Sequence, residues 1–564
     1  MGERLLRLQL MLLVAFGVLV VRLVHLQLVH GHMYRRLAEQ NRVRLVHEPS
    51  PRGLILDSQG RVMAASQTIF RVAVVPQETP DLASLLAHIS PLTHRSPEVL
   101  RAQYQKERSF AFVPATIVSY VPKETALQLE EARWRLPGLL VKSETVRAYP
   151  GGSVAAHVLG YLSQPTAEEL PRLKSYGVRP TQLVGRMGVE RLLDDVLRGT
   201  SGGLMVEVNN RGKQVRVLGR KPPEGGGLVI LTLDVALQSL IAQALGSQAG
   251  AAVVLNPTTG AVLAMVSSPS FSPESFVITS GDTVRRLLID PQAPLMNRST
   301  VGMYTPGSIA KLITAAAALD QHVITPSTTI VCPGALTIGD RTFHCWNRDG
   351  HGPLTLSEAL MQSCNVYFMT VGRRLGVARL RAAMERIGWG RRSGWPMEEQ
   401  PGHLPSRRLT EGEVAILAIG QGEVLLTPTQ AAVMASAFAN GGSVVTPWIV
   451  QSVEGRPGPR PVSRRIGWSA ATLEAVREGM QMVVSHPAGT GHRAFTSTVS
   501  IAGKTGTAQT HEPERPHGWF VGFCPVEQPR VAMAIVAEHG GSGGDLPADI
   551  ARSICEYVSA AEIL

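Results

Sequence analysis

The longest apolar stretch of the chain lies at its N-terminus. Residues 8–21 carry no charged side chain and are almost all apolar, and the apolar pattern continues through Leu28. Fourteen residues are short for a membrane span, but Arg22 and His25 can extend their polar ends to the interface, which lengthens the helix to about twenty residues. No small-x-small cleavage site follows, so the pattern predicts an uncleaved anchor formed by residues 1–30. No second stretch of this kind occurs.

The arginines around the anchor do not fix its orientation. Arg4 and Arg7 precede it, and four more arginines follow within residues 35–44. Long domains cross a membrane largely regardless of such charges, so the bulk of the chain can lie outside the cytoplasm.

Between the anchor and residue 225 the hydrophobic pattern alternates between short strands and helices. The predicted elements are strands and a turn within 51–66, strands at 72–75 and 116–121, helices at 82–89 and 124–132, and a helix from Gly185 to Arg198 closed by glycines. No catalytic constellation occurs before residue 228. We therefore interpret residues 31–225 as a packing module.

A run of prolines and glycines at residues 221–227 marks a domain boundary. Beyond it the pattern predicts a strand at 228–233, a helix at 235–245, a hairpin at 251–266 and further strands after residue 490. Strands that enclose a long helical stretch predict an α/β (α+β) domain at 228–564, with helices packed against an antiparallel sheet.

Composition and charge limit the classes of partner that the chain can bind. The chain has 564 residues, a net charge of +11 and 44% hydrophobic residues. The arginines are dispersed and no basic run is interleaved with aromatic residues, so we expect no nucleic acid partner. The net positive charge instead indicates a cationic surface that lies near anionic lipid or an acidic polymer.

The candidate chemistry begins at Ser308 and Lys311, which lie three residues apart at the start of a predicted helix. Residues at this spacing share a helix face, so a neutral lysine there can take the proton of the serine and activate it as a nucleophile. A lone pair of this kind is usually a helix start with a solvated lysine. Lysine usage changes that balance: of eight lysines, only Lys311 and Lys504 follow Lys221. Arginine cannot replace a titratable amine, which explains why lysine is kept at these two places.

Two further motifs follow in order, Ser363-Cys364-Asn365 and Lys504-Thr505-Gly506-Thr507. The three together resemble the motif set of penicillin-binding proteins and class A β-lactamases, although the middle motif there is Ser-Asp-Asn. Much of the chain resembles class B penicillin-binding proteins, and the elongation-specific penicillin-binding protein 2 subgroup looks closest. The matching stretches are 51–60, 185–203, 208–212, 297–298, 350–352, 420–422, 427–428 and 519–523.

This resemblance implies a serine-type D,D-transpeptidase that cross-links peptidoglycan stem peptides during cell-wall elongation and cell-shape maintenance, and that β-lactam antibiotics acylate. It also implies a pedestal of the dimerisation type at 31–225, an extracytoplasmic catalytic domain on the cytoplasmic (inner) membrane, and a RodA-type membrane glycosyltransferase as partner. No cofactor is expected for catalysis.

Each motif residue then has an expected role in acyl transfer. Ser308 attacks a D-alanyl-D-alanine carbonyl while Lys311 accepts its proton, Ser363 relays a proton to the leaving amine, and Asn365 positions Lys311 and the substrate amide. Lys504 supplies positive potential, which favours a neutral Lys311. We expect Thr505 and Thr507 to bind the terminal carboxylate of the substrate, and Gly506 to let its backbone lie along the strand.

The five cysteines leave two interpretations open. Outside the cytoplasm the default is a disulfide, for which Cys332–Cys345 is the local candidate. Alternatively Cys332, Cys345, His351 and Cys364 hold a structural zinc ion. Similar ligand positions occur beside the active site of some elongation-type relatives, with aspartates at the first two positions. We interpret Cys524 and Cys555 as buried small residues.

Several alternatives share the motifs: a division-type transpeptidase, a β-lactam sensor, a β-lactamase or carboxypeptidase, and a scaffold that activates a glycosyltransferase. A sensor needs further spans and an output module, and no H-E-x-x-H sequence occurs. Hydrolases of this type rarely carry an anchor and a leading module of this length. The transpeptidase hypothesis therefore leads.

Overall fold

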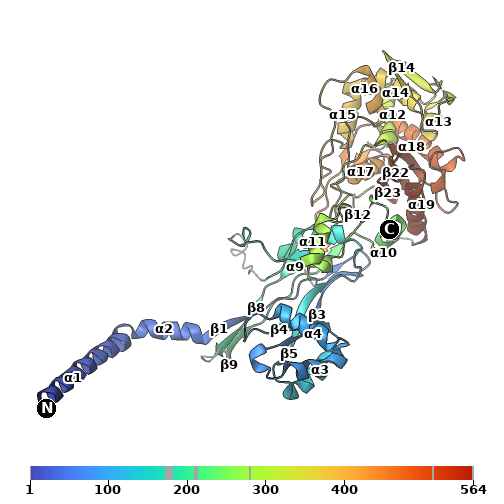
Figure 1. The fold of residues 1–564 in the computed structure, drawn as a ribbon. Coiled ribbons are helices and arrows are strands. Elements are labelled where there is room, and N and C mark those ends of the chain that lie inside the picture. The colour runs from blue at the N-terminus through green and yellow to red at the C-terminus, as the bar shows by residue number, and fades with distance from the viewer. Residues whose placement is uncertain (1, 172–181, 209–213, 278–280, 511–513, 562–564) are drawn as a thin grey trace. The chain divides into compact units, whose positions relative to one another are not determined.

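The computed structural model describes residues 2–171, 182–208, 214–277, 281–510 and 514–561 (Figure 1). Two compact units result: Met1–Arg52 with Arg198–Gly226, and Gly53–Leu197 with Gly227–Leu564. Residues 209–212, part of the resemblance to the elongation-specific subgroup, lie outside the described residues.

The first unit begins with helical segments and continues in a small sheet. It contains α1 (Gly2–Val24), a π-helical turn (His25–Val29), α2 (Gly31–Arg42) and an antiparallel sheet of β1 (Val43–Glu48), β8 (Gly202–Val208) and β9 (Gln214–Lys221). Within the described residues, one helical stretch, Leu5–Val29, is long and apolar enough to cross a membrane. Its 25 residues span about 37 Å as a helix, which exceeds the roughly 30 Å hydrocarbon core of a bilayer.

The second unit joins the leading module to the C-terminal part through one sheet. Its strand order is β19 (Arg456–Pro457), β18 (Val450–Val453), β10 (Val229–Leu231), β2 (Ile55–Leu56), β3 (Val62–Val74) and β4 (Ala115–Val121), and β5 (Leu139–Ala148) also pairs with β3. Strand β10 pairs parallel to β2, so one continuous sheet contains strands from both the leading module and the C-terminal part. Helices α3 (Leu82–Thr93), α4 (Pro97–Glu107) and α5 (Lys123–Ala132) share a separate hydrophobic core with strands β3, β4 and β5.

The centre of the C-terminal part is a five-stranded antiparallel sheet, as the sequence predicts. Its order is β12 (Val262–Ser268), β11 (Gly250–Leu255), β23 (Val531–Ala537), β22 (His517–Cys524) and β21 (Ala502–Ala508). Ala252 and Val254 share a core with α10 (Val235–Leu245) and α19 (Leu546–Ala560), whereas Ala251 and Val253 face the larger helical core. Because helices cover both faces, the central strands β11 and β23 are apolar throughout rather than alternating.

The larger helical core carries the motifs. Its helices are α12 (Lys311–Asp320), α13 (Leu356–Met361), α14 (Asn365–Leu375), α15 (Val377–Ile387), α16 (Glu411–Ala418), α17 (Pro428–Ala439) and α18 (Ala470–Ser485). Short strands β13 (Ile330–Cys332), β14 (Ala335–Ile338), β15 (Arg341–His344) and β16 (Gly352–Leu354) form two hairpin-like pairs ahead of α13. The remaining short elements are α6 (Ala156–Leu159), β6 (Leu162–Ser163), β7 (Val184–Gly185), α8 (Gly188–Leu192), α9 (Asp194–Arg198), α11 (Gly281–Ile289), β17 (Ser443–Val444) and β20 (Arg464–Arg465).

The single helix predicted from Gly185 to Arg198 is wrong. Gly185 ends a short strand, and two helices of five residues each follow, separated at Leu193. The backbone N–H of Gly185 donates to Asp194 Oδ1, which holds the start of this segment in an extended conformation. Tertiary hydrogen bonding therefore overrides the amphipathic pattern here.

Candidate active site

Ser308 lies in a single 3₁₀ turn, Gly307–Ala310, that leads directly into α12. Gly307 has a φ of +56°, and a Cβ there would lie 2.9 Å from the carbonyl oxygen of Thr507. Its N–H donates to the carbonyl of Gly420 at 2.8 Å. The turn that carries Ser308 is thus held between strand β21 and the Gly420–Gly422 loop, and glycine is required for the close approach.

Lys311 is completely buried beneath Ser308 at the start of α12. Its Nζ donates to Asn365 Oδ1 at 2.7 Å, to the Ser363 carbonyl at 2.7 Å and to Ser363 Oγ at 3.2 Å. The first and second motifs are therefore in direct contact. Within the described part of the chain, the bonds of this amine go to the second motif rather than to the Ser308 hydroxyl.

Ser363 Oγ is the point where the three motifs meet. It accepts from Lys504 Nζ at 2.9 Å as well as from Lys311. Ser363 has a φ of +55°, a left-handed conformation that serine rarely adopts. Such strain costs of order 1–3 kcal/mol and persists where the surrounding structure fixes it, often at functional sites.

Burial shifts the pKa values of both lysines. Burial lowers the pKa of Lys311 to about 8, against a smaller opposing effect of negative charge on Cys364 and Cys345. The pKa of Lys504 is also lowered, by burial and then by the nearby Lys311 charge. Charge on Lys311 disfavours charge on Lys504, because two buried ammonium groups around one hydroxyl repel each other.

The third motif lies on β21, at the edge of the five-stranded sheet. Thr505 Oγ1 hydrogen-bonds to Thr490 Oγ1 at 2.7 Å, and Lys504 Nζ donates to the Thr505 carbonyl at 2.9 Å. A Cβ on Gly506 would lie 3.0 Å from the Pro306 carbonyl oxygen. The close approach that requires glycine there is therefore that of the Pro306 carbonyl, just before Ser308, and the contact of Gly506 with substrate backbone stays a prediction.

The predicted residues surround one cavity of about 850 Å³. Ser308, Ser363, Asn365, Thr505 and Thr507 line it, while the side chains of Lys311 and Lys504 lie buried behind this surface. The other lining residues are Thr342, Phe343, His344, Cys345, Trp346, Arg348, Met369, Ile416, Ile419, Gln421, Gly422, Thr490, Gln509 and Ser542. The volume lies within the range of about 300–1,000 Å³ of small-molecule sites.

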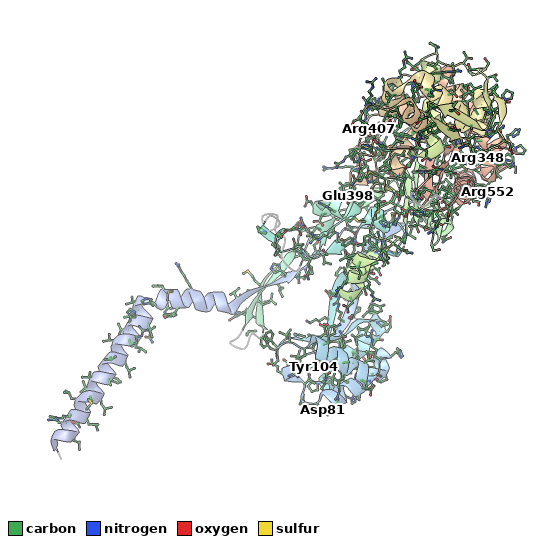
Figure 2. All side chains as sticks on the ribbon, turned by 45° about the horizontal axis from the view of Figure 1, so that its top comes forward. Asp81, Tyr104, Arg348, Glu398, Arg407 and Arg552 are labelled. Carbon is green, nitrogen blue, oxygen red and sulfur yellow. A yellow bond between two sulfur atoms is a disulfide. The ribbon has the colours of Figure 1, made fainter. Side chains whose placement is uncertain are left out.

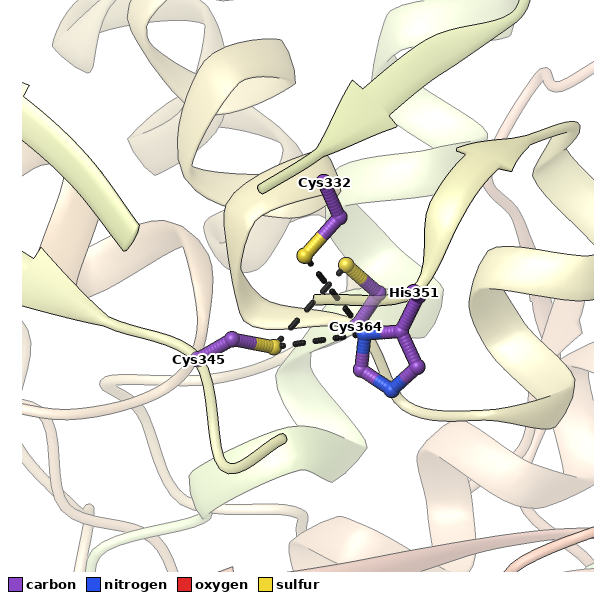
Figure 3. Close-up of side chains that lie close together, drawn as sticks. All are labelled: Cys332, Cys345, His351 and Cys364. Carbon is purple, nitrogen blue, oxygen red and sulfur yellow. Dashed lines mark hydrogen bonds between the residues drawn. The ribbon is translucent and has the colours of Figure 1, made fainter. Parts of the chain in front are cut away.

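Four sulfur and nitrogen donors gather beside the active site (Figure 3). Ligand atoms of Cys332, Cys345, His351 and Cys364 all lie within 4.8 Å of one another. His351 Nδ1 is 3.5 Å from Cys332 Sγ and 3.6 Å from Cys345 Sγ, and Cys345 Sγ is 4.0 Å from Cys364 Sγ. The predicted Cys332–Cys345 disulfide is wrong, because both sulfurs are free and face the imidazole.

These distances suit a tetrahedral metal ion. Zinc with Zn–S bonds of about 2.3 Å and Zn–N bonds of about 2.0 Å separates its ligand atoms by about 3.5–3.8 Å. The pKa of the Cys345 thiol is lowered to about 4, because the Cys364 thiol and then the Asn365 N–H hydrogen-bond to its sulfur. The Asn365 N–H donates to that sulfur at 3.3 Å, and the side chain of the same Asn365 accepts from Lys311 Nζ. Asn365 therefore links the cysteine cluster to Lys311.

Cys524 and Cys555 form a disulfide, which corrects the interpretation that they are only buried small residues. Both are fully buried, and the bond links the end of β22 to helix α19. No local spacing signals the pair, because the two residues are 31 positions apart.

Glu538 supports the segment before Ser308, a role that the sequence motifs do not predict. Glu538 Oε1 accepts from Tyr304 Oη at 2.7 Å and from Arg298 Nε at 3.0 Å. This contact ties the segment before Ser308 to the end of β23. The resemblance at Asn297-Arg298 was the only sequence signal for this contact. It did not reveal Glu538, which lies 240 residues after Arg298.

Comparisons with known proteins show which family the chain belongs to. Residues 250–556 match the penicillin binding protein transpeptidase domain, and residues 47–231 match the penicillin-binding protein dimerisation domain. The chain is 32% identical to the peptidoglycan D,D-transpeptidase MrdA of Haemophilus influenzae over 590 residues, which covers 97% of this chain and 90% of that protein. It is 33% identical to MrdA of Escherichia coli K12 over 571 residues, which covers 94% and 90%.

Solved structures show the same similarity. The complex between penicillin-binding protein PBP2 and MreC from Helicobacter pylori matches with a TM-score of 0.77 and 27% identity, over 93% of this chain and 100% of that chain. A structure on the coordination of polymerization and crosslinking by a peptidoglycan synthase complex matches with a TM-score of 0.78 and 29% identity, over 100% and 99%.

Proposed function

The chain belongs to the class B penicillin-binding proteins, as an elongation-type peptidoglycan D,D-transpeptidase, and from that premise we propose that Ser308 is the nucleophile that carries the acyl group. The observation that carries this assignment is the meeting of three motifs at one hydroxyl. Lys311 and Lys504 both donate to Ser363 Oγ beneath a cavity that Ser308 lines.

The first half-reaction forms an ester. Ser308 Oγ attacks the carbonyl carbon of the D-alanyl-D-alanine peptide bond, and its proton passes to the Lys311 amine. The tetrahedral intermediate then loses the terminal D-alanine, whose amine receives a proton through Ser363. Backbone N–H groups of Ser308 and Thr507 stabilise the oxyanion, at about 3 kcal/mol for each donor in comparable sites.

The substrate itself sets the protonation of the lysine pair. A carboxylate bound by Thr505 and Thr507 lies next to Lys504 and favours the charged form of that amine. Charge on Lys504 disfavours charge on Lys311, because both amines donate to the same hydroxyl. Lys311 is then the free base at the moment when Ser308 must lose its proton.

The second half-reaction makes the cross-link. The amine of a neighbouring stem peptide attacks the Ser308 ester, forms a new amide bond and returns the proton to Ser308. A β-lactam forms the same ester through its strained amide, which leaves no departing D-alanine. We therefore assign β-lactam acylation to Ser308 as well.

The remaining regions receive supporting roles in this proposal. Residues 1–30 anchor the protein in the cytoplasmic membrane, 31–225 form the pedestal, and 228–564 form the extracytoplasmic transpeptidase domain. The disulfide between Cys524 and Cys555 supports an oxidising, extracytoplasmic location for that domain. A RodA-type membrane glycosyltransferase is the proposed partner; one similar structure is a complex with MreC, and another concerns a peptidoglycan synthase complex.

Cys332, Cys345, His351 and Cys364 fit a structural zinc ion in both donor type and spacing. The ion would join β13, the segment after β15 and the N-terminus of α14, and so fix the backbone on both sides of Ser363. Three free thiols in a protein that also contains a disulfide support this assignment, because metal binding protects thiolates from oxidation.

Metal analysis of the purified full chain tests the zinc assignment. We expect one zinc ion for each wild-type chain and none in Cys332→Ser/His351→Ala. Zinc-free wild-type protein with unchanged thermal stability would contradict it.

The transpeptidase assignment is tested by product analysis. Purified full chain is supplied with uncross-linked glycan strands that carry pentapeptide stems, and the products are separated and identified by mass spectrometry. We expect cross-linked dimers with wild type, and none with Ser308→Ala or after penicillin treatment. Trimmed tetrapeptides without dimers would instead indicate a carboxypeptidase.

A further inference from the structure

The active-site cavity contains a charged side chain that the proposed reaction does not use. Arg348 lines the same cavity as Ser308 and Thr507. Among the described lining residues it is the one arginine, and no aspartate or glutamate lines the cavity with it. Arg348 therefore brings a positive charge to the cavity that no carboxylate among the described lining residues offsets.

The guanidinium of Arg348 is also available for a ligand. Within the described part of the chain, no carboxylate or carbonyl oxygen accepts a hydrogen bond from it, and the side chain is exposed. Arg407, elsewhere in the same unit, is by contrast paired with Glu413 and Glu423. Figure 2 labels Arg348 and Arg407 among the side chains of this unit.

The backbone that carries Arg348 is firmly held. Cys345 and His351 close the loop at its two ends, where their N–H groups donate to the carbonyls of Gly334 and Cys332. A Cβ on Gly334, whose φ is +91°, would lie 2.0 Å from the carbonyl oxygen of Arg348. Close backbone packing therefore fixes the position of the Arg348 backbone, although its side chain is exposed.

The neighbouring Trp346 adds an apolar surface to the same loop. Its ring is 60% exposed, yet its Nε1 donates to the Gln362 carbonyl at 2.9 Å, and it also lines the cavity. An aromatic ring held by this hydrogen bond, on the same anchored loop as the Arg348 guanidinium, suits a peptide that carries a carboxylate. Planar guanidinium groups bind carboxylates through two parallel hydrogen bonds.

We propose that Arg348 binds a second carboxylate of the donor stem peptide, in the part that precedes D-alanyl-D-alanine. The inference rests on the proposed function, which places the terminal carboxylate at Thr505 and Thr507. The two cationic positions, Lys504 and Arg348, would then select a peptide with an acidic group at each end of the bound segment. Arg348 is in this sense a specificity-determining residue and takes no part in bond making.

Peptide binding tests the inference. Two fluorescent peptides end in D-alanyl-D-alanine and differ only in the preceding residue, which is glutamate in one and glutamine in the other. Their dissociation constants are measured by anisotropy on full-length chain with Ser308→Ala, so that no peptide is processed. We expect the glutamate peptide to bind about five- to tenfold more tightly, with a preference that shrinks at high salt.

Variants assign the preference to one side chain. Arg348→Gln should remove it, Arg348→Lys should keep part of it, and Arg392→Gln, at an exposed arginine outside the cavity lining, should leave it intact. An unchanged preference in Arg348→Gln, or none in the Ser308→Ala chain, would overturn the inference. Penicillin labelling of the same Arg348 variants with Ser308 intact reports separately on the proposed function. A penicillin has no counterpart of the second peptide carboxylate, so its reaction does not depend on the proposed contact.

Discussion

Arg147 and Glu190 form an ion pair from which water is excluded. Their side chains are 1% and 0% exposed, and Arg147 Nε lies 2.7 Å from Glu190 Oε1. Arg147 Nη1 also donates to the Gly53 carbonyl at 2.6 Å, and the Tyr149 hydroxyl lies 3.2 Å from the same Glu190 oxygen. The pair therefore joins three separate segments of the leading module.

Glu190→Gln keeps the size of the side chain and an oxygen acceptor but removes its charge. The buried guanidinium is then left without a counter-charge, which costs about 3–5 kcal/mol when a partner is removed from such a pair. Because the amide oxygen still accepts a hydrogen bond, we expect the lower end, about 3 kcal/mol. In the unit formed by Gly53–Leu197 and Gly227–Leu564, whose unfolding entropy is about 2.1 cal/mol/K per residue, that corresponds to a fall in Tm of roughly 3 °C.

Thermal unfolding of the full chain, followed by intrinsic fluorescence, measures the effect. The matched control is Glu411→Gln, which breaks an ion pair with Arg373 in which Glu411 is 73% exposed. Exposed pairs contribute at most about 1 kcal/mol, so the control should change Tm little. Restoring part of the loss with Arg147→Met/Glu190→Leu would support the argument, and equal shifts for Glu190→Gln and Glu411→Gln would refute it.

Three further predictions concern the catalytic half. Penicillin acylation should accelerate as pH rises through about 8, because Lys311, whose pKa is lowered to about 8, accepts the nucleophile's proton only as the free amine; a rate that is flat across this range would contradict that role. Cys555→Ala opens the 31-residue loop closed by the disulfide with Cys524 and should lower the free energy of unfolding by roughly 3–4 kcal/mol, measured by denaturant titration beside wild type; an unchanged midpoint would count against a formed disulfide. Gly420→Ala places a Cβ 2.1 Å from the Gly307 carbonyl oxygen at a φ of +72° and should slow acylation about a hundredfold by displacing the nucleophile turn, whereas a wild-type rate would show that the turn adjusts.

The parts of the fold that follow from local pattern could be predicted. The apolar runs near residues 251–266 and beyond 490 predicted an antiparallel sheet with helices, and the structure confirms this arrangement. The three motifs also predicted that Lys311, Ser363 and Lys504 lie together, because acyl transfer needs these side chains in one site whatever their distance along the chain. In the structure both lysines donate to Ser363 Oγ.

Other features depend on contacts between distant segments, which a sequence pattern does not encode. The disulfide between Cys524 and Cys555 requires β22 and α19 to pack together. Glu538 supports Arg298 only because β23 ends beside the segment before the nucleophile. The left-handed backbone of Ser363 is imposed by its surroundings, since nothing in the residue type favours it.

The most direct test of the central claim is identification of the acylated residue. Purified full chain is treated with a fluorescent penicillin, wild type beside Ser308→Ala, and the labelled peptide is sequenced by mass spectrometry. We predict a stable ester on Ser308 in wild type and no labelled peptide in the variant. A label on another residue, or a label that persists in Ser308→Ala, would contradict the account.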